Sequence, residues 1–198
     1  MNLSYIREIG PVAFPQWTGE RVYMRPFTKA AGLPPHLRRW QSTIGAMLSG
    51  VDTEEPIYLM IDQSEVHAGQ SQRRPGVHID GYWIAGSGKH GPKPPGHCGS
   101  WDTPAPGWKH VNFSRPEALI LASDVEASRA FLGHWEGEVA EGGDCRAVSL
   151  GGLAACNLLA NHAYAGNVSM LHESLPVSCV TRRTLVRLNV PGWSPETL

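Results

Sequence analysis

The sequence lacks any long block of charge of one sign. Its 17 Lys and Arg residues against 18 Asp and Glu residues give a formal net charge of -1. Without a global basic field, the composition disfavours duplex nucleic acid as a partner, because such binding draws on many phosphate contacts. A nucleobase or a single nucleotide is not excluded by this argument. The arginines occur partly as isolated pairs, at 38–39, 73–74 and 182–183.

Long apolar runs and closely spaced cysteines are also lacking. No apolar run reaches the length that spans a bilayer, and the first residues do not show the basic and apolar regions of a secretory signal. The four cysteines, at 98, 145, 156 and 179, form no CxxC pair. We therefore expect a cytoplasmic protein with reduced thiols and no membrane association.

Helical patterns are scarce, whereas Gly and Pro are frequent along the chain, with 22 and 16 residues. One amphipathic helix is predicted at about 35–49 from its apolar spacing. The first 33 residues read as irregular apart from one short strand at 19–27. Length and composition predict a single mainly β domain, 1–198, of jelly-roll or related barrel type with one or two supporting helices. Further strands are expected at 57–62, 77–85, 117–123, 129–135, 145–150, 166–171 and 178–188.

Residues 86–110 are dense in Gly and Pro and predict a long loop. A loop of this length inside a domain is usually functional or disordered, and we expect it to act as a lid near the site. Trp101 and Trp108 within it are candidate substrate contacts. Arg74, in the stretch "RRPG", is a third candidate, although that stretch also reads as an ordinary turn.

The stretch "VHIDG" at 77–81 carries the first chemical motif. Residues two apart in a strand point to the same side, so His78 and Asp80 would present an imidazole and a carboxylate together. One more histidine would complete a facial set of two histidines and one carboxylate, which suits non-haem Fe(II). An HxD pair is weak evidence alone. His134 and Glu136 form a similar pair, but glycines bracket it and no suitable partner follows.

The C-terminal stretch "HESLPVSCVTRRTLVRL", 172–188, begins with a histidine and later reads as a strand. Strand alternation puts Arg182 and Thr184 on its apolar face, which we expect to point inward. A buried guanidinium needs an anionic partner, and a carboxylate can satisfy its fork with two hydrogen bonds. Arg183 is the alternative inward residue if the strand carries a bulge. A structural ion pair to Glu173 or Asp80 would explain Arg182 without any ligand.

Three elements together, "HID" at 78–80, His172 and "RRT" at 182–184, resemble the pattern of the Fe(II)/2-oxoglutarate-dependent dioxygenase superfamily. The C-terminal stretch is also similar to that of its prolyl-hydroxylase-like members. The resemblance implies a double-stranded β-helix of the jelly-roll or cupin-like type. It further implies a hydroxylase that uses Fe(II), 2-oxoglutarate and O2 and converts 2-oxoglutarate to succinate and CO2.

The resemblance also implies roles for individual residues. His78, Asp80 and His172 would bind Fe(II), and Arg182 and Thr184 would bind the far carboxylate of 2-oxoglutarate. Candidates for a further donor to the cosubstrate are Tyr58 and Tyr82. The substrate stays open between a small molecule, a peptide and a nucleobase. Two alternatives stay open as well: a metal-dependent isomerase or lyase that grips its substrate's carboxylate with Arg182, and a non-catalytic metal-binding barrel.

Overall fold

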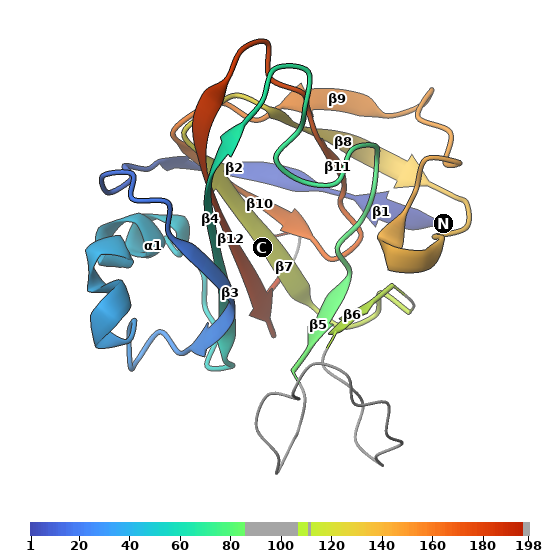
Figure 1. Cartoon of the computed structure of the whole chain (residues 1–198). Helices are drawn as coiled ribbons and strands as arrows, with labels where there is room; N and C mark the ends of the chain where they lie inside the picture. The colour runs from blue at the N-terminus through green and yellow to red at the C-terminus, as the bar shows by residue number, and fades with distance from the viewer. Residues whose placement is uncertain (86–106, 111, 196–198) are drawn as a thin grey trace, which may run out of the picture.

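A computed structural model describes residues 1–85, 107–110 and 112–195 (Figure 1). Strands dominate these residues, and every strand pair within them is antiparallel. The prediction of a mainly β fold is therefore confirmed.

The larger sheet has six strands in the order β2-β10-β7-β12-β4-β3. Its members are β2 (Ile6–Pro11), β3 (Arg21–Phe27), β4 (Ile57–Val66), β7 (Glu117–Ser123), β10 (His162–Asn167) and β12 (Thr181–Pro191). The central strand β12 pairs along most of its length with both β4 and β7. The larger sheet therefore joins segments that are far apart in the sequence.

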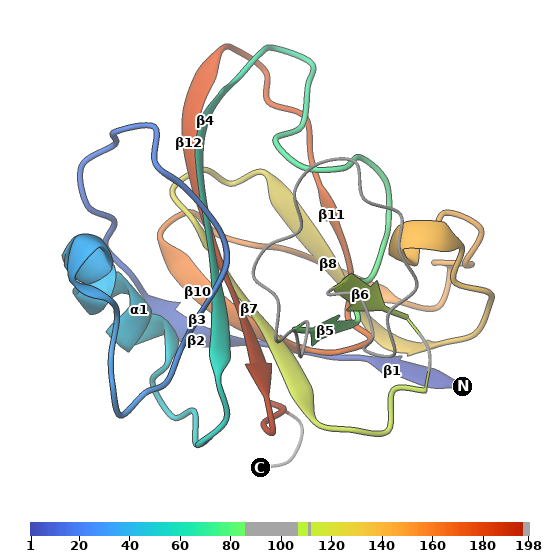
Figure 2. The same ribbon diagram turned by 60° about the horizontal axis from the view of Figure 1, so that its bottom comes forward.

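The smaller sheet is built around β8, which pairs with three other strands. Its members are β1 (Asn2–Ser4), β8 (Ser128–Trp135), β9 (Ala154–Asn157) and β11 (Leu171–Ser174). A separate two-stranded ribbon consists of β5 (Tyr82–Ile84) and β6 (Gly107–Lys109). Figures 1 and 2 show β8 and β11 on one side of the larger sheet and α1 on the other.

The predicted helix at about 35–49 is present as two consecutive pieces, the 3₁₀ helix η1 (Pro35–Trp40) and α1 (Gln41–Met47). A second short 3₁₀ helix, η2 (Glu141–Gly143), lies near the smaller sheet. The apolar side of η1 and α1 packs on the larger sheet and forms the main hydrophobic core. Trp40 is fully buried in this core, together with Ile120 from β7 and Leu188 from β12.

The central strands β7 and β12 of the larger sheet are buried on both faces, and this overturns one prediction from the sequence. On β12, Val186 and Leu188 belong to the core under the helix, whereas Leu185 and Arg187 line a cavity on the opposite face. The apolar face of β12 is thus the one that faces away from the cavity. The prediction that Arg182 points inward is wrong, because Arg182 lies on the helix-side face and is exposed.

Several predicted elements differ from those observed. Residues 1–33 are not irregular, since they contain β1 and β2 as well as the predicted β3. The segment predicted as one strand at 77–85 is an isolated bridge at His78 followed by the short β5. The strand expected at 145–150 is a turn. Within the predicted loop 86–110, β6 is a strand and residues 86–106 lie outside the described part of the chain.

The burial of Trp40 gives a test of the core. We expect Trp40→Ala to lower the free energy of unfolding by about 3–5 kcal/mol, because it removes a large buried side chain and leaves a cavity. Urea denaturation measures the change. Arg38→Ala, an exposed position in the same helical segment, should change stability by about 0.5 kcal/mol or less. Equal effects of the two substitutions would contradict this packing.

Candidate metal centre

Three side chains predicted as metal ligands lie together. One donor atom from each of His78, Asp80 and His172 falls within 4.8 Å of the other two. The Nε2 atom of His172 is 3.7 Å from Oδ2 of Asp80, and the centroids of the two imidazole rings are 4.3 Å apart. The structure therefore contains a possible metal-binding group of two histidines and one carboxylate.

The backbone holds the two histidines against each other. The N–H of His78 donates to the carbonyl of His172 at 2.9 Å, and the N–H of His172 donates back at 3.0 Å. On its other side, the His78 segment is bonded to residues 143 and 145. His78 thus has strand-like pairing on both sides, although it belongs to no regular strand. His172, in β11, is held directly opposite it.

The segment turns sharply directly after Asp80. Gly81 has a φ of +70°, and a Cβ built there would lie 2.2 Å from the backbone oxygen of Lys109. Only glycine permits this conformation together with so close an approach. The turn ends the strand-like segment at the carboxylate and directs the chain into β5.

Hydrogen bonds orient both imidazoles. Nδ1 of His78 lies 2.8 Å from the carbonyl of Gly76, and Nδ1 of His172 lies 3.1 Å from the carbonyl of Met170. In the neutral rings Nδ1 carries the proton and donates it to the carbonyl, which leaves the lone pair of Nε2 for a metal.

The local electrostatics favour the protonation states that metal binding requires. Burial lowers the pKa of His78 to about 3 and also lowers the pKa of His172, so both rings are neutral near pH 7. Burial opposes ionisation of Asp80, but Arg187 beside it outweighs this effect and the pKa of Asp80 is about 2. The group therefore offers two neutral imidazoles and one carboxylate without first having to lose protons.

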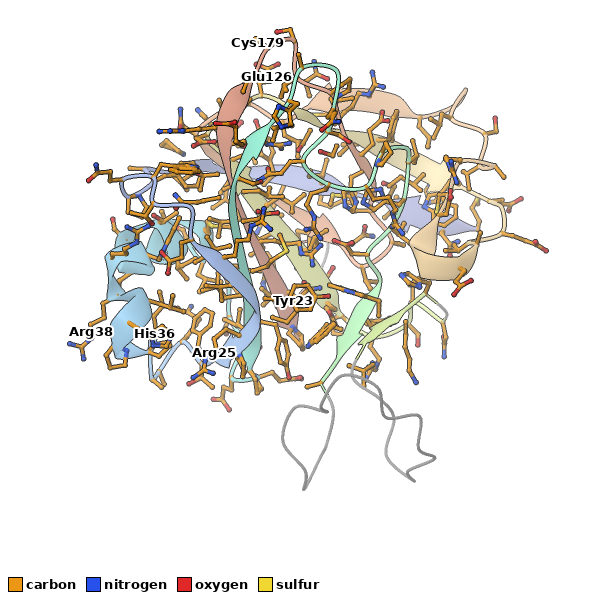
Figure 3. All side chains as sticks on the ribbon, in the orientation of Figure 1. Tyr23, Arg25, His36, Arg38, Glu126 and Cys179 are labelled. Carbon is orange, nitrogen blue, oxygen red and sulfur yellow. The ribbon has the colours of Figure 1, made fainter. Side chains whose placement is uncertain are left out.

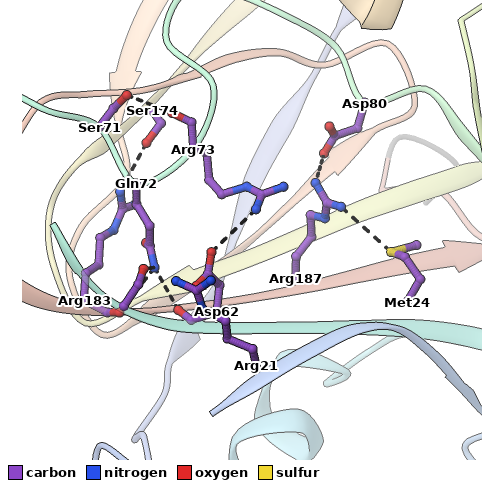
Figure 4. A network of polar contacts seen from close by, with 11 residues as sticks. Arg21, Met24, Asp62, Ser71, Gln72, Arg73, Asp80, Ser174, Arg183 and Arg187 are labelled. Carbon is purple, nitrogen blue, oxygen red and sulfur yellow. Dashed lines mark hydrogen bonds and ion pairs between the residues drawn. The ribbon is translucent and has the colours of Figure 1, made fainter. Parts of the chain in front are cut away.

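Arg187 is a site residue that the sequence analysis missed. Its Nη1 donates to Oδ2 of Asp80 at 2.7 Å, and its Nη2 lies 3.8 Å from the sulfur of Met24 (Figure 4). Its guanidinium lies 4.7 Å from the centre of the Trp108 ring. The side chain of Arg187 is buried and its Nε has no hydrogen-bond partner. Its place four residues after Arg183, on the same face of β12, is the signal that could have found it.

An irregularity in β3 brings Met24 to this arginine. The register between β3 and β4 shifts between Val22 and Arg25, and Met24 has a φ of +48°. A left-handed conformation is costly for a residue with a long side chain. It turns the Met24 side chain inward, where it is buried next to Arg187. Backbone strain at one edge of the sheet thus helps to hold the guanidinium in place.

The inward arginine of the "RRT" element is Arg183. It is fully buried, and its three donors reach the hydroxyls of Ser123 at 3.0 Å, Ser174 at 3.3 Å and Ser128 at 2.8 Å. No carboxylate lies within ion-pair distance of Arg183 among the residues that the structure describes. Burial lowers its pKa to about 10, so it remains a cation at neutral pH. Arg183 is a buried positive charge whose side-chain hydrogen bonds all go to neutral hydroxyls, and the charges of Asp124 and Asp62 reach it without forming an ion pair.

The other residues predicted for the cosubstrate lie elsewhere. Arg182 packs against the ring of Trp17 at 4.8 Å. The hydroxyl of Thr184, on the same face of β12, accepts a hydrogen bond from Gln63. Tyr82 both donates to and accepts from the backbone of Arg115. None of the three, nor Tyr58, lines the cavity described next.

The metal-binding group opens into a cavity of about 270 Å³ between the two sheets. Leu121, Leu185 and Arg187 come from the larger sheet, and Ser128 and Ser174 come from the smaller one. The two serines also bind Arg183, so the buried arginine lies directly behind this wall. Arg74 and Trp108, two predicted substrate contacts, line the cavity as well, and their role stays a prediction. Trp101 lies outside the described residues.

No family model, curated protein or solved structure matches this chain. Among the described residues, no helix is long and apolar enough to cross a membrane. The cytoplasmic location stays a prediction. Any functional assignment must therefore come from the geometry of the cavity and its side chains.

A buried carboxyl group connects this cavity to the rest of the sheet. Glu117, at the start of β7, accepts hydrogen bonds from the backbone N–H of Trp83 at 3.0 Å and from Asn189 at 3.3 Å. Trp83 in β5 packs edge-on against Trp108 in β6, with ring centroids 5.1 Å apart. Burial raises the pKa of Glu117 to about 7. Glu117 therefore anchors the ribbon that carries Trp108, and it titrates near neutral pH.

The first prediction from this site concerns the metal. The protein should bind a divalent transition-metal ion, and His172→Ala should weaken the affinity by more than about 100-fold, since loss of an outer partner of a ligand alone costs 10–100-fold. Competition against a chromophoric chelator measures it. His134→Ala, an exposed histidine on β8, is the matched control and should have no effect. Equal affinity in both variants would rule out His172 as a ligand.

The second prediction concerns stability and pH. Because the pKa of Glu117 in the folded protein lies above its ordinary value of 4.5, its contribution to stability is fully present below about pH 4.5 and is lost as the pH rises through about 7. Between about pH 5 and pH 8, the wild type should lose up to about 3 kcal/mol of unfolding free energy that Glu117→Gln does not lose. Glu126→Gln, at an exposed position (Figure 3), should follow the wild type. Parallel pH profiles of wild type and Glu117→Gln would contradict the raised pKa.

Proposed function

We propose that this protein is an Fe(II)- and 2-oxoglutarate-dependent oxygenase that hydroxylates a substrate. One observation carries the proposal: the cavity at the His78, Asp80 and His172 group is also lined by Ser128 and Ser174, and their hydroxyls bind a buried arginine, Arg183, that forms no ion pair. A metal-chelating acid with a second carboxylate would engage both features at once. The proposal also assigns the two facing antiparallel sheets to a double-stranded β-helix.

The donor set supports iron as the metal. Two neutral imidazoles and one carboxylate leave several positions of an octahedral ion open, and this set is typical of non-haem Fe(II) oxygenases. A structural zinc site would instead use four protein ligands and be closed. Open positions are what a chelating cosubstrate and O2 require.

Arg183 supports 2-oxoglutarate as the cosubstrate. Burial of a cation without an anion is costly, so an arginine in this position favours a ligand that supplies negative charge. The far carboxylate of 2-oxoglutarate would accept bonds from the guanidinium, and the hydroxyls of Ser128 and Ser174 could donate to the same group. In this proposal Arg183 takes the role that the sequence pattern gave to Arg182.

The chain's own groups would set the conditions for the chemistry. Iron, when bound, would supply the site where O2 is activated; O2 would be the oxidant, and 2-oxoglutarate would supply two of its four electrons and leave as succinate and CO2. The carbonyls of Gly76 and Met170 hold the imidazoles in one tautomer and orientation. Arg187 keeps Asp80 ionised and holds one of its oxygens, and Trp108 and Leu185 cover the cavity with apolar surface that excludes water.

A metal-dependent isomerase or lyase is the second candidate. It is favoured by Arg187, because a buried guanidinium with one free N–H beside the metal ligands could hold a substrate's own carboxylate. Such an enzyme would form no succinate and would not need Arg183 for turnover.

Anaerobic spectroscopy distinguishes the oxygenase from the isomerase or lyase. Addition of Fe(II) and then 2-oxoglutarate should produce the visible metal-to-ligand charge-transfer band of the chelate. Arg183→Met should weaken 2-oxoglutarate binding by about 100-fold, because it removes charge-assisted hydrogen bonds worth about 3 kcal/mol. Arg182→Met, one residue away and with an exposed side chain on the opposite face of β12, is the matched control and should leave the affinity unchanged.

A band that depends on Arg183 but not on Arg182 supports the oxygenase and the inward assignment. Iron binding without a band would contradict the oxygenase and favour the isomerase or lyase. A band that depends on Arg182 instead would show that β12 carries its cosubstrate contact on the face opposite to the cavity, against the geometry described above.

A further inference from the structure

Around the cavity, the positive charges of the arginines outnumber the negative charges of the carboxylates. Of the carboxylates that line it, Asp80 is paired with Arg187 at 2.7 Å, and Glu173 is paired with Arg129 through two contacts of 2.6 and 2.8 Å. Neither of these carboxylates is therefore available to neutralise the remaining cations at the mouth.

Arg74 is one of these cations. It lines the cavity and is exposed, and its guanidinium donates to the carbonyl of Gly142. No carboxylate among the described residues lies within ion-pair distance of it. Asp144, whose charge reaches Arg74, is already bound by Arg146 through its guanidinium.

Arg73 adds to the positive charge at the mouth of the cavity. Its Nη1 lies 3.5 Å from Asp62, but the same carboxylate is 3.5 Å from the guanidinium of Arg21 (Figure 4). One negative charge is thus shared between two positive ones. The mouth of the cavity keeps a positive excess at Arg73 and Arg74 after every ion pair among the described residues has been counted.

Cosubstrate binding would not remove this excess. The two charges of 2-oxoglutarate would be met by those of Fe(II), and Arg183 would add another positive charge. The loaded cavity stays positive, and such a field attracts anions into a site with low-dielectric walls. Trp108 lines the same cavity, and its indole offers an apolar surface to the remainder of a bound molecule.

We propose that the substrate acted on in this cavity is a small anion, a carboxylate or a phosphate ester with an apolar or aromatic body, and that Arg74 binds its charged group. This inference rests on the proposed oxygenase function and adds the substrate's chemical class to it. The planar fork of Arg74 suits either anionic group, since both accept two parallel hydrogen bonds.

The test uses three probes of similar size: benzoate, phenyl phosphate and neutral benzamide. Calorimetry measures their binding to the full-length protein loaded anaerobically with Fe(II) and 2-oxoglutarate, and to the protein loaded with Fe(II) alone. The charge-transfer band, recorded on the same samples, shows whether 2-oxoglutarate is bound and stays bound. The ratio of the affinities for benzoate and phenyl phosphate distinguishes a carboxylate substrate from a phosphate substrate.

At least one anionic probe should bind about tenfold more tightly than benzamide, the ratio expected for a charge-assisted hydrogen bond of about 1.4 kcal/mol. Arg74→Gln should abolish this preference without changing the affinity for iron or 2-oxoglutarate, and Arg74→Lys should restore part of it. Arg38→Gln, which removes the same charge from the exposed side of η1 (Figure 3), should keep the full preference.

Equal binding of charged and neutral probes, or a preference that survives Arg74→Gln, would overturn the inference while an intact band leaves the oxygenase standing. Absence of the band in the wild type would overturn the oxygenase. In that case an Arg74-dependent preference for anions in the iron-loaded protein would still support the anion site. If that preference were also absent, both the oxygenase and the anion site would be contradicted.

Discussion

The candidate site depends on two reciprocal hydrogen bonds between the backbones of His78 and His172. These bonds set the two segments side by side at one point, and they do so without a continuous strand pairing around His78. The imidazoles, their carbonyl partners and the nearby carboxylate all take their positions from this bridge. A shift of either segment by one residue would turn a ligand away from the cavity, because neighbouring residues of extended chain point to opposite sides.

The sequence was sufficient to predict the possible metal-binding group and much of the sheet. HxD spacing and a downstream histidine identified His78, Asp80 and His172, and apolar spacing identified the helix beneath the larger sheet. Arg183 could not be chosen over Arg182 by the same reasoning. The rule that the apolar face points inward assumes one buried face, whereas β12 is buried on both and presents its more polar face to the cavity. Arg187 on that face was missed for the same reason.

The N-terminal strands show a different limit of sequence interpretation. Nothing in the alternation of residues 1–11 indicates a strand, yet β2 pairs along β10 and β1 pairs with β8. Their conformation comes from strand edges that are formed by distant parts of the chain. Local propensity contains little of that information, so tertiary context decides.

The interior combines an ion pair, Asp80 with Arg187, with one buried charge, Arg183, that forms no ion pair. Asp80 and Arg187 are buried together, and each favours the ionised form of the other. Arg183 donates hydrogen bonds only to hydroxyls, and the charges of Asp124 and Asp62 offset only part of the cost of burying it. Strain at Met24, next to Arg187, is located in the same part of the fold.

The bridge between His78 and His172 has a further consequence. Nearly half of the chain lies between these two residues, so an ion bound to both would act as a cross-link that closes a very long loop. Such closure lowers the entropy of the unfolded chain, much as a disulfide does, and metal affinity then becomes part of the folding free energy. The supply of such a metal ion would thereby help to determine how much folded protein is present.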